Sequence, residues 1–190
     1  MERAKMIRLF ILVLIISLGA IIWTFSGFKN DFQLGIGLLM AILTGLWLIS
    51  LVIKDASIID VFWGSGFVII AWFYAFQNDL ANLGFREMIL LSMITIWGMR
   101  LTIYLAMRNL GKGEDYRYAQ WRKDNGEKWW WLSFFRVFAL QGFLLWIISA
   151  TYLPSLSTRA EMGVLEYFGV LLWTIGLFFE SVGDYQLAQF

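Results

Sequence analysis

Long apolar runs are the feature that most constrains what this sequence can form. A helix needs about 20 apolar residues to cross the hydrocarbon core of a membrane. Six such runs follow one another along the chain: 9–28, 32–53, 61–76, 88–107, 129–153 and 164–184. The third run is short for a span unless its helix begins near residue 57. Lipid offers the backbone no hydrogen bonds, so each run must satisfy its own peptide groups as a helix. The sequence therefore predicts an all-α, polytopic membrane bundle with about six transmembrane helices.

The composition supports the same conclusion. Hydrophobic residues make up 60% of the 190 residues and charged residues only 15%, whereas soluble domains have about 45–50% and about 25%. We therefore expect a single transmembrane domain over residues 1–190. The formal net charge of +1 gives no support to binding of nucleic acid.

Two residue types are missing, and their absence restricts the chemistry. The chain has no cysteine, which excludes disulfides, thiolate metal sites and a cysteine nucleophile. It has no histidine either, so it lacks the commonest general base and the commonest metal ligand. Any reaction must use carboxylates, tyrosine, arginine, lysine, backbone groups or a bound cofactor.

The basic residues between the runs predict an orientation. If the N-terminus lies in the cytoplasm, the inner segments hold ten Lys and Arg residues and the outer loops hold three. Such a bias is typical of cytoplasmic loops. We therefore expect a cytoplasmic N-terminus and a cytoplasmic segment 108–128, which carries six basic and four acidic residues.

An arginine lies inside the fourth run. A charge within hydrocarbon costs at least a few kcal/mol, which makes Arg100 a candidate functional residue. Tyr104 and Arg108 follow at i+4 and i+8, so the three side chains share one helix face. Because the charged segment 108–128 follows directly, we interpret this region as the anion-binding edge of an active site.

Other polar residues are predicted to lie at the same depth, in the cytoplasmic half of their helices. Arg136 and Gln141 belong to the fifth run, and Glu180 and Asp184 stand four residues apart near the inner end of the last run. Their common depth predicts one pocket, open to the cytoplasm, that they share with Arg100.

Each of these residues also has a simpler explanation. Arg100 and Arg136 could extend to the lipid headgroups, and Glu180 and Asp184 could be their structural partners. Asp60 follows a serine by three residues, a pattern that favours a helix-capping box. The whole segment 108–128 could bind lipid headgroups.

Several motifs together resemble a known family. They are Asp60-Val-Phe-Trp63-Gly64, Trp97-Gly-Met-Arg100-Leu, Gly111-Lys-Gly-Glu-Asp-Tyr-Arg-Tyr118 and Phe179-Glu180-Ser-Val-Gly-Asp184-Tyr-Gln186-Leu. The combination is similar to the DUF1295-type branch of the steroid 5-alpha-reductase superfamily. The resemblance covers residues 57–190, whereas residues 1–56, with the first two helices, add little to it. It also implies a multi-pass protein of a bacterial inner membrane.

The resemblance implies an oxidoreductase. In the reductases, NADPH lies in a pocket open to the cytosol and reduces the double bond of an enone lipid such as a steroid. Arginine suits the phosphates because it offers forked, permanently charged donors. The expected cofactor-binding residues are Arg100, Arg108, Arg117, Arg122, Glu180 and Asp184. The candidate proton donors are Tyr104, Tyr116 and Tyr118, among which the sequence does not choose.

One part of the family pattern is missing from these residues. Family members continue with a Gly-Leu-Trp segment and an Arg-His-Pro-Asn-Tyr motif that complete the cofactor site. This chain ends at Phe190 and has no histidine. We therefore expect it to lack the C-terminal part of the site and to be, by itself, a poor reductase.

Two other functions remain open at this stage. Membrane methyltransferases that act on isoprenoids or other lipids share the superfamily's C-terminal architecture, although a methyl donor lacks the polyphosphate that clustered arginines favour. The third function is non-enzymatic: binding of membrane lipid through the basic segment 108–128.

Overall fold

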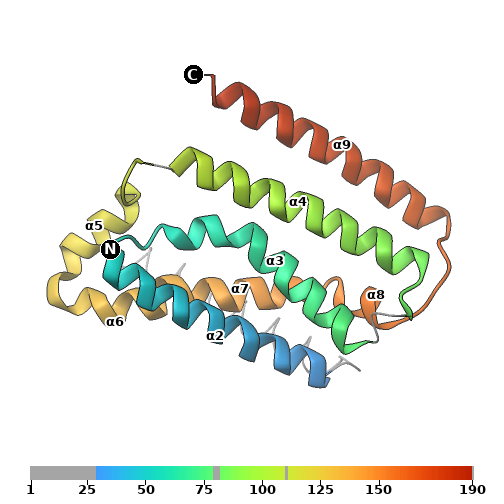
Figure 1. Ribbon diagram of the computed structural model, residues 1–190, viewed down its shortest axis with the longest axis horizontal. Helices are drawn as coiled ribbons and strands as arrows, with labels where there is room; N and C mark the ends of the chain where they lie inside the picture. Colours follow the sequence, from blue (N-terminus) through green and yellow to red (C-terminus); the bar gives the residue numbers. More distant parts are fainter. Residues whose placement is uncertain (1–28, 79–81, 110, 190) are drawn as a thin grey trace, which may run out of the picture.

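The described part of the protein consists of helices. The computed structural model describes residues 29–78, 82–109 and 111–189, and no strand occurs among them (Figure 1). Five helical segments are long and apolar enough to cross a membrane: Asn30–Ile53, Ile58–Gln77, Phe85–Asn109, Tyr116–Ser149 and Val164–Leu187. The prediction of an all-α, polytopic membrane bundle is confirmed. The predicted first span, 9–28, lies outside the described residues.

Most of the predicted spans correspond to single helices. These are α2 (Lys29–Ile53), α3 (Ile58–Gln77), α4 (Phe85–Asn109) and α9 (Val164–Leu187). The third predicted run is indeed completed by residues from the vicinity of Ser57, which precedes α3. Helix α2 ends where Lys54 adopts a positive φ of 57°.

The predicted fifth span is wrong at its C-terminal end. It consists of α6 (Trp129–Ser133), a π-helix η3 (Phe134–Ala139) and α7 (Leu140–Ser149), and a separate short helix α8 (Leu153–Ser157) follows. Pro154 lies in the first turn of α8. Proline suits that position because the first turn of a helix needs no backbone N–H donor.

The charged segment that we expected as a loop contains a helix of its own. Helix α5 spans Tyr116–Asn125, and the short 3-10 helix η2 (Gly126–Lys128) connects it to α6. The Asp115 carboxylate caps α5 by accepting a hydrogen bond of 2.9 Å from the backbone N–H of Arg117. Gly126, with a φ of 50°, ends the helix.

The core lies where α2, α3 and α7 meet. Trp146 of α7 stacks on Phe32 of α2 with ring centroids 4.2 Å apart, and its indole N–H donates to the Phe32 carbonyl at 2.6 Å. A second cluster of buried residues lies closer to α5: Leu43, Ala56, Ile59, Tyr118, Trp129, Val137 and Phe138. Helix α5 is therefore packed against the bundle by apolar burial as well as by polar contacts.

Helices α3 and α4 approach each other through two glycines. A Cβ on Gly64 would lie 2.1 Å from the Gly98 carbonyl oxygen, and a Cβ on Gly98 would lie 2.6 Å from the Gly64 carbonyl oxygen. No side chain fits between backbones this close. The glycines fix α4 directly on α3.

Helix α9 lies at the edge of the bundle, beside α4 (Figure 1). None of its residues is buried. At the end near α8, Arg86 of α4 approaches Glu166 of α9, with Nε and Oε1 3.8 Å apart. We call this the α8 end of the bundle and the opposite end, where α4 and α9 finish, the α5 end.

Candidate functional site

Three residues of α4 line one face near the α5 end. Arg100 and Tyr104 line one cavity, and Tyr104 and Arg108 line the next. The guanidinium carbon of Arg108 lies 5.9 Å from the centroid of the Tyr104 ring. The prediction that the three share a helix face is confirmed.

Arg100 connects α4 to α9. Its Nη1 lies 3.1 Å from Glu180 Oε1, and its Nη2 donates to Asp184 Oδ2. Its Nε donates to Ser181 Oγ at 2.9 Å. The indole N–H of Trp97, one turn earlier on α4, also donates to Glu180, at 3.1 Å. We refer to these five residues as the α4–α9 clamp.

The clamp changes what Arg100 can offer to a ligand. All three of its guanidinium nitrogens donate to α9, and its one positive charge faces two carboxylates. The clamp therefore has two carboxylates for one guanidinium. Glu180 and Asp184 do gather around Arg100, as their common depth predicted, and the contacts make them its structural partners.

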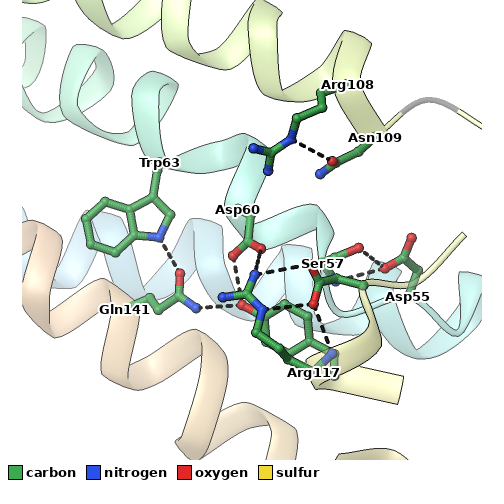
Figure 2. A network of polar contacts seen from close by, with 10 residues as sticks. Asp55, Ser57, Asp60, Trp63, Arg108, Asn109, Arg117 and Gln141 are labelled. Atoms are coloured by element: carbon green, nitrogen blue, oxygen red, sulfur yellow. Dashed lines mark hydrogen bonds and ion pairs between the residues drawn. The ribbon is translucent and has the colours of Figure 1, made fainter. Parts of the chain in front are cut away.

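A second polar group joins α3, α5 and α7 (Figure 2). Tyr118 Oη donates to Asp60 Oδ1 at 2.7 Å and accepts from Gln141 Nε2 at 3.2 Å. The indole N–H of Trp63 donates to Gln141 Oε1, and Arg117 Nη2 donates to Asp60 Oδ2 at 3.0 Å. The hydroxyl of Tyr118 is the centre of this α3–α5–α7 network, and the residue is only 4% exposed.

Both arginines of α5, Arg117 and Arg122, form ion pairs with carboxylates that precede the helix. Arg117 Nε donates to Asp115 Oδ1 at 2.8 Å, and the hydrogen bonds from Arg117 hold the pKa of the Asp115 carboxyl below its usual value. Arg122 binds Glu114 with both Nε and Nη2, at 2.9 and 2.8 Å. The same carboxylate accepts from the Ala56 backbone N–H at 2.8 Å. These pairs hold the α4–α5 segment against the beginning of α3.

Arg108 and Lys112 differ from these arginines. Within the described residues neither makes an ion pair, and the one hydrogen bond of the Arg108 guanidinium is a long one, 3.4 Å, to Asn109 Oδ1 (Figure 2). Both side chains are exposed. They line a cavity of about 660 Å³ together with Tyr104 and Ala188.

A second cavity continues the first toward the clamp. Its volume is about 310 Å³, and its lining includes Arg100, Asp184 and Tyr185. The two cavities share Tyr104 and Ala188. We call them together the α4–α9 cleft. It has Arg108 and Lys112, which form no ion pair with the described residues, at one end, the clamp with its two carboxylates at the other and Tyr104 between them.

The three candidate tyrosines occupy different surroundings. Tyr104 lines the cleft, and Tyr118 is buried in the α3–α5–α7 network. Tyr116 is 80% exposed on α5. By position, Tyr104 is the tyrosine that a molecule in the cleft would meet.

Two sequence-based predictions about polar residues are wrong. Arg136 does not join the clamp: it is exposed, and its Nη1 lies 3.4 Å from Asn125 Oδ1. Ser57 and Asp60 do not form a capping box, since the Ser57 side chain makes no cap and instead donates to Asp55. Asp60 is occupied by Arg117 and Tyr118.

Two contributors to the site were not identified from the sequence. Ser181 binds Arg100, and Lys112 lines the cleft. Ser181 directly follows Glu180, so an inventory of the α9 face that meets α4 would have included it. Lys112 had been counted only among the basic residues of the segment, because its place in a cavity depends on how α9 lies against α4.

The comparisons with known proteins add one finding. The family model described as "Protein of unknown function (DUF1295)" matches residues 46–190, which is more than half of the chain and includes both polar groups. Comparison with curated proteins and with solved structures gives no match.

Proposed function

The chain belongs to the DUF1295 family, and from that premise we propose that it is a membrane oxidoreductase that binds NADPH in the α4–α9 cleft and reduces the double bond of an enone lipid. The observation that carries this proposal is that Arg108 and Lys112 lie beside Tyr104 in the cleft and form no ion pair with any described residue. The likeness of the sequence motifs to steroid 5-alpha-reductases supplies the reaction class.

The cations suit the phosphates of the cofactor. An arginine or lysine without a carboxylate partner can bind a phosphate without first breaking an ion pair. Within the described part of the chain Arg108 and Lys112 meet this condition, whereas Arg100, Arg117 and Arg122 already bind carboxylates. We therefore assign the direct phosphate contacts to Arg108 and Lys112. The predicted cofactor contacts of the other three arginines stay a prediction.

The size and position of the cleft are consistent with this assignment. Its two cavities, of about 660 and 310 Å³, fall within the range of about 300–1,000 Å³ typical of ligand sites. Under the orientation that the basic residues predict, the cleft opens on the cytoplasmic side, where NADPH is found. No residue of α9 is buried in the described structure, and we propose that the lipid enters the cleft along this helix.

Tyr104 is the proposed proton donor. Bound NADPH would supply a hydride to one carbon of the double bond. The Tyr104 hydroxyl would give its proton to the other carbon and regain one from solvent, so that C=C becomes CH–CH. Glu180 and Asp184 are proposed to hold Arg100, and through it α9, beside Tyr104.

Binding of NADPH to the purified protein in detergent tests the proposal. Energy transfer from the tryptophans to NADPH reports binding even if the 190 residues reduce poorly, as the sequence leads us to expect. Arg108→Ala should weaken binding about tenfold, since a hydrogen bond to a charged group contributes about 1.5–3 kcal/mol. Lys123→Ala is the matched control: it removes an exposed cation of α5 outside the cleft and should leave the affinity unchanged.

The same titration with S-adenosylmethionine separates the alternatives. Binding of S-adenosylmethionine without NADPH would replace the reductase by a methyltransferase. Binding of neither would favour a non-enzymatic lipid-binding protein. Tyr104→Phe should keep NADPH affinity and abolish the NADPH oxidation that the unaltered chain supports with an enone lipid; equal and measurable oxidation by both proteins would remove Tyr104 from the reaction.

A further inference from the structure

A buried carboxylate lies at the α8 end, far along α4 from the cleft. Glu87, in the first turn of α4, is 1% exposed, and neither of its carboxylate oxygens has a hydrogen-bond partner. Its nearest cation, Arg86 Nη1, is 4.0 Å from Oε1, which is too long for a hydrogen bond. A buried charged group without hydrogen bonds is strongly unfavourable. Glu87 is therefore a buried acceptor to which the described residues donate no hydrogen bond.

Glu87 lines a cavity with cationic residues. The cavity has a volume of about 640 Å³, and its lining includes Arg86, Arg159, Glu161 and Tyr167. Arg159 is exposed and makes no ion pair among the described residues. Apart from Glu87, the partners of Arg86 among the described residues are all at long distances: Ser155 Oγ at 3.4 Å, the Thr158 carbonyl at 3.5 Å and Glu166 at 3.8 Å. The cavity thus offers an anion that lacks a donor and cations that lack a close acceptor.

An apolar cavity adjoins the polar one between α4 and α9. Its volume is about 360 Å³, and its lining includes Ile89, Leu90, Met93, Val170 and Trp173. It shares Arg86 and Met162 with the polar cavity. A ligand that fills both would have a head with charges of both signs and an apolar tail.

We propose that the α8 end binds a phospholipid whose headgroup carries a primary ammonium, of the phosphatidylethanolamine class. The ammonium donates hydrogen bonds to Glu87, the phosphate accepts from Arg159 and Arg86, and one acyl chain lies between α4 and α9 against Met93 and Trp173. The assignment is independent of NADPH and of the α4–α9 cleft. It gives α9 a lipid partner at the end where the protein itself provides only long polar contacts.

Lipid titrations of the delipidated protein in detergent, followed by native mass spectrometry, test the site. Phosphatidylethanolamine should bind at least about tenfold more tightly than phosphatidylcholine of the same chains, because the methylated nitrogen has no N–H for Glu87 and would leave it unsatisfied. Phosphatidylglycerol, which lacks the amine, should also bind weakly. Equal affinities for the three lipids would overturn the proposal.

Two variants assign the selectivity to the buried carboxylate. Glu87→Gln should remove the preference for phosphatidylethanolamine over phosphatidylcholine, and Glu161→Gln, at the exposed rim of the same cavity, should keep it. If Glu87→Gln does not fold, Arg159→Ala provides the second test through an affinity loss of about tenfold for phosphatidylethanolamine. Retention of full selectivity in Glu87→Gln, or of full affinity in Arg159→Ala, contradicts the site.

A headgroup without chains distinguishes a lipid from a free phosphate compound. Glycerophosphoethanolamine should not compete at concentrations that saturate the site with the lipid, because it cannot fill the apolar cavity. Competition at equal concentration would show that the head alone is recognised and would overturn the assignment of the acyl chain.

Discussion

Helix α4 has two very different neighbours. On the α3 side, Gly64 and Gly98 bring the two backbones together so closely that neither position has room for a Cβ. On the α9 side, the contacts are long polar side chains at each end, with cavities along the helix. Helix α9 also has glycines, Gly169, Gly176 and Gly183, but beyond the backbone of α9 itself no described atom lies within 4 Å of where their Cβ atoms would be.

The difference separates the fixed part of the molecule from its adjustable part. Because the backbones of α3 and α4 are in direct contact, the two helices cannot shift relative to each other without losing that close packing. The α4–α9 contact depends on a few ion pairs, which can break and re-form while the helices stay folded. A ligand-binding cleft is therefore more easily accommodated on the α9 side, and four substitutions test this contrast.

Gly64→Ala should have the largest effect. The added Cβ would lie 2.1 Å from the Gly98 carbonyl oxygen, which is backbone and cannot turn aside. Overpacking costs about 1–3 kcal/mol and sometimes more, and we expect a loss of about 3 kcal/mol, measured by thermal unfolding in detergent. Gly37→Ala on α2, where no neighbouring atom of the described residues lies within 4 Å, is the control. A Gly64→Ala protein as stable as the control would mean that α3 and α4 do not touch there.

Arg100→Ala should release α9 from α4. It leaves Glu180 and Asp184 together without their cation, at a cost of about 2 kcal/mol, less than for a fully buried pair because these side chains are partly exposed. Because the chain has no cysteine, cysteines introduced at Met93 and Gly169, which line one cavity, report the spacing of the helices by cross-linking. We expect the yield to fall. Arg117→Ala, which removes an arginine of α5, should leave it unchanged, and an equal yield in both variants would refute the clamp.

Tyr118→Phe tests a polar contact that lies over a packed core. The change leaves Gln141 Nε2 and Asp60 Oδ1 without their shared partner and should lower the free energy of unfolding by about 1 kcal/mol. The ring keeps its apolar contacts, so the α4–α9 cross-linking yield should not change. Tyr116→Phe, on an 80% exposed residue, should alter neither measurement. If Tyr118→Phe lowered the free energy of unfolding more than Arg100→Ala does, the α3–α5–α7 network would contribute more to stability than the α4–α9 clamp, contrary to our expectation.

Gly176→Ala should have the smallest effect and the opposite sign. Among the described residues nothing fills the space that a Cβ would take at Gly176, and alanine favours a helix over glycine by about 0.5–1 kcal/mol. We expect a stabilisation of about 0.5 kcal/mol in thermal unfolding. Destabilisation would show that α9 packs as closely as α3 does.

The sequence predicts the helices well because every span must cross a membrane of the same thickness and must satisfy its backbone hydrogen bonds internally, as a helix. It also places Arg100, Glu180 and Asp184 at one depth, and the contacts confirm that they meet. Depth alone could not exclude Arg136 from the clamp, because the depth of a residue does not tell in which direction its side chain points from the helix. The periodicity of the apolar residues shows neither the π-helix shortly before Gln141 nor the end of α7 at Ser149.

The polar contacts near α5 were harder to predict for a related reason. Ser57 and Asp60 have the spacing of a capping box, but Arg117 and Tyr118 from α5 compete for Asp60 and bind it instead. These partners are far away in the sequence. Helix α5 itself was missed because its composition is that of a solvated loop, and burial of Tyr118 and its capping by Asp115 stabilise it.

The π-helix η3 determines which residues of α7 face α3 and α5. A π turn accommodates one residue more than an α turn, so it acts as a one-residue insertion within a continuous helix. Each residue of an α-helix turns the chain by about 100°. Deleting one residue from Phe134–Ala139 would restore a regular helix and rotate Gln141 by about that angle, away from Tyr118 and Trp63. In alignments of relatives, a gap at this place would mark proteins that cannot form the same connection between α3, α5 and α7.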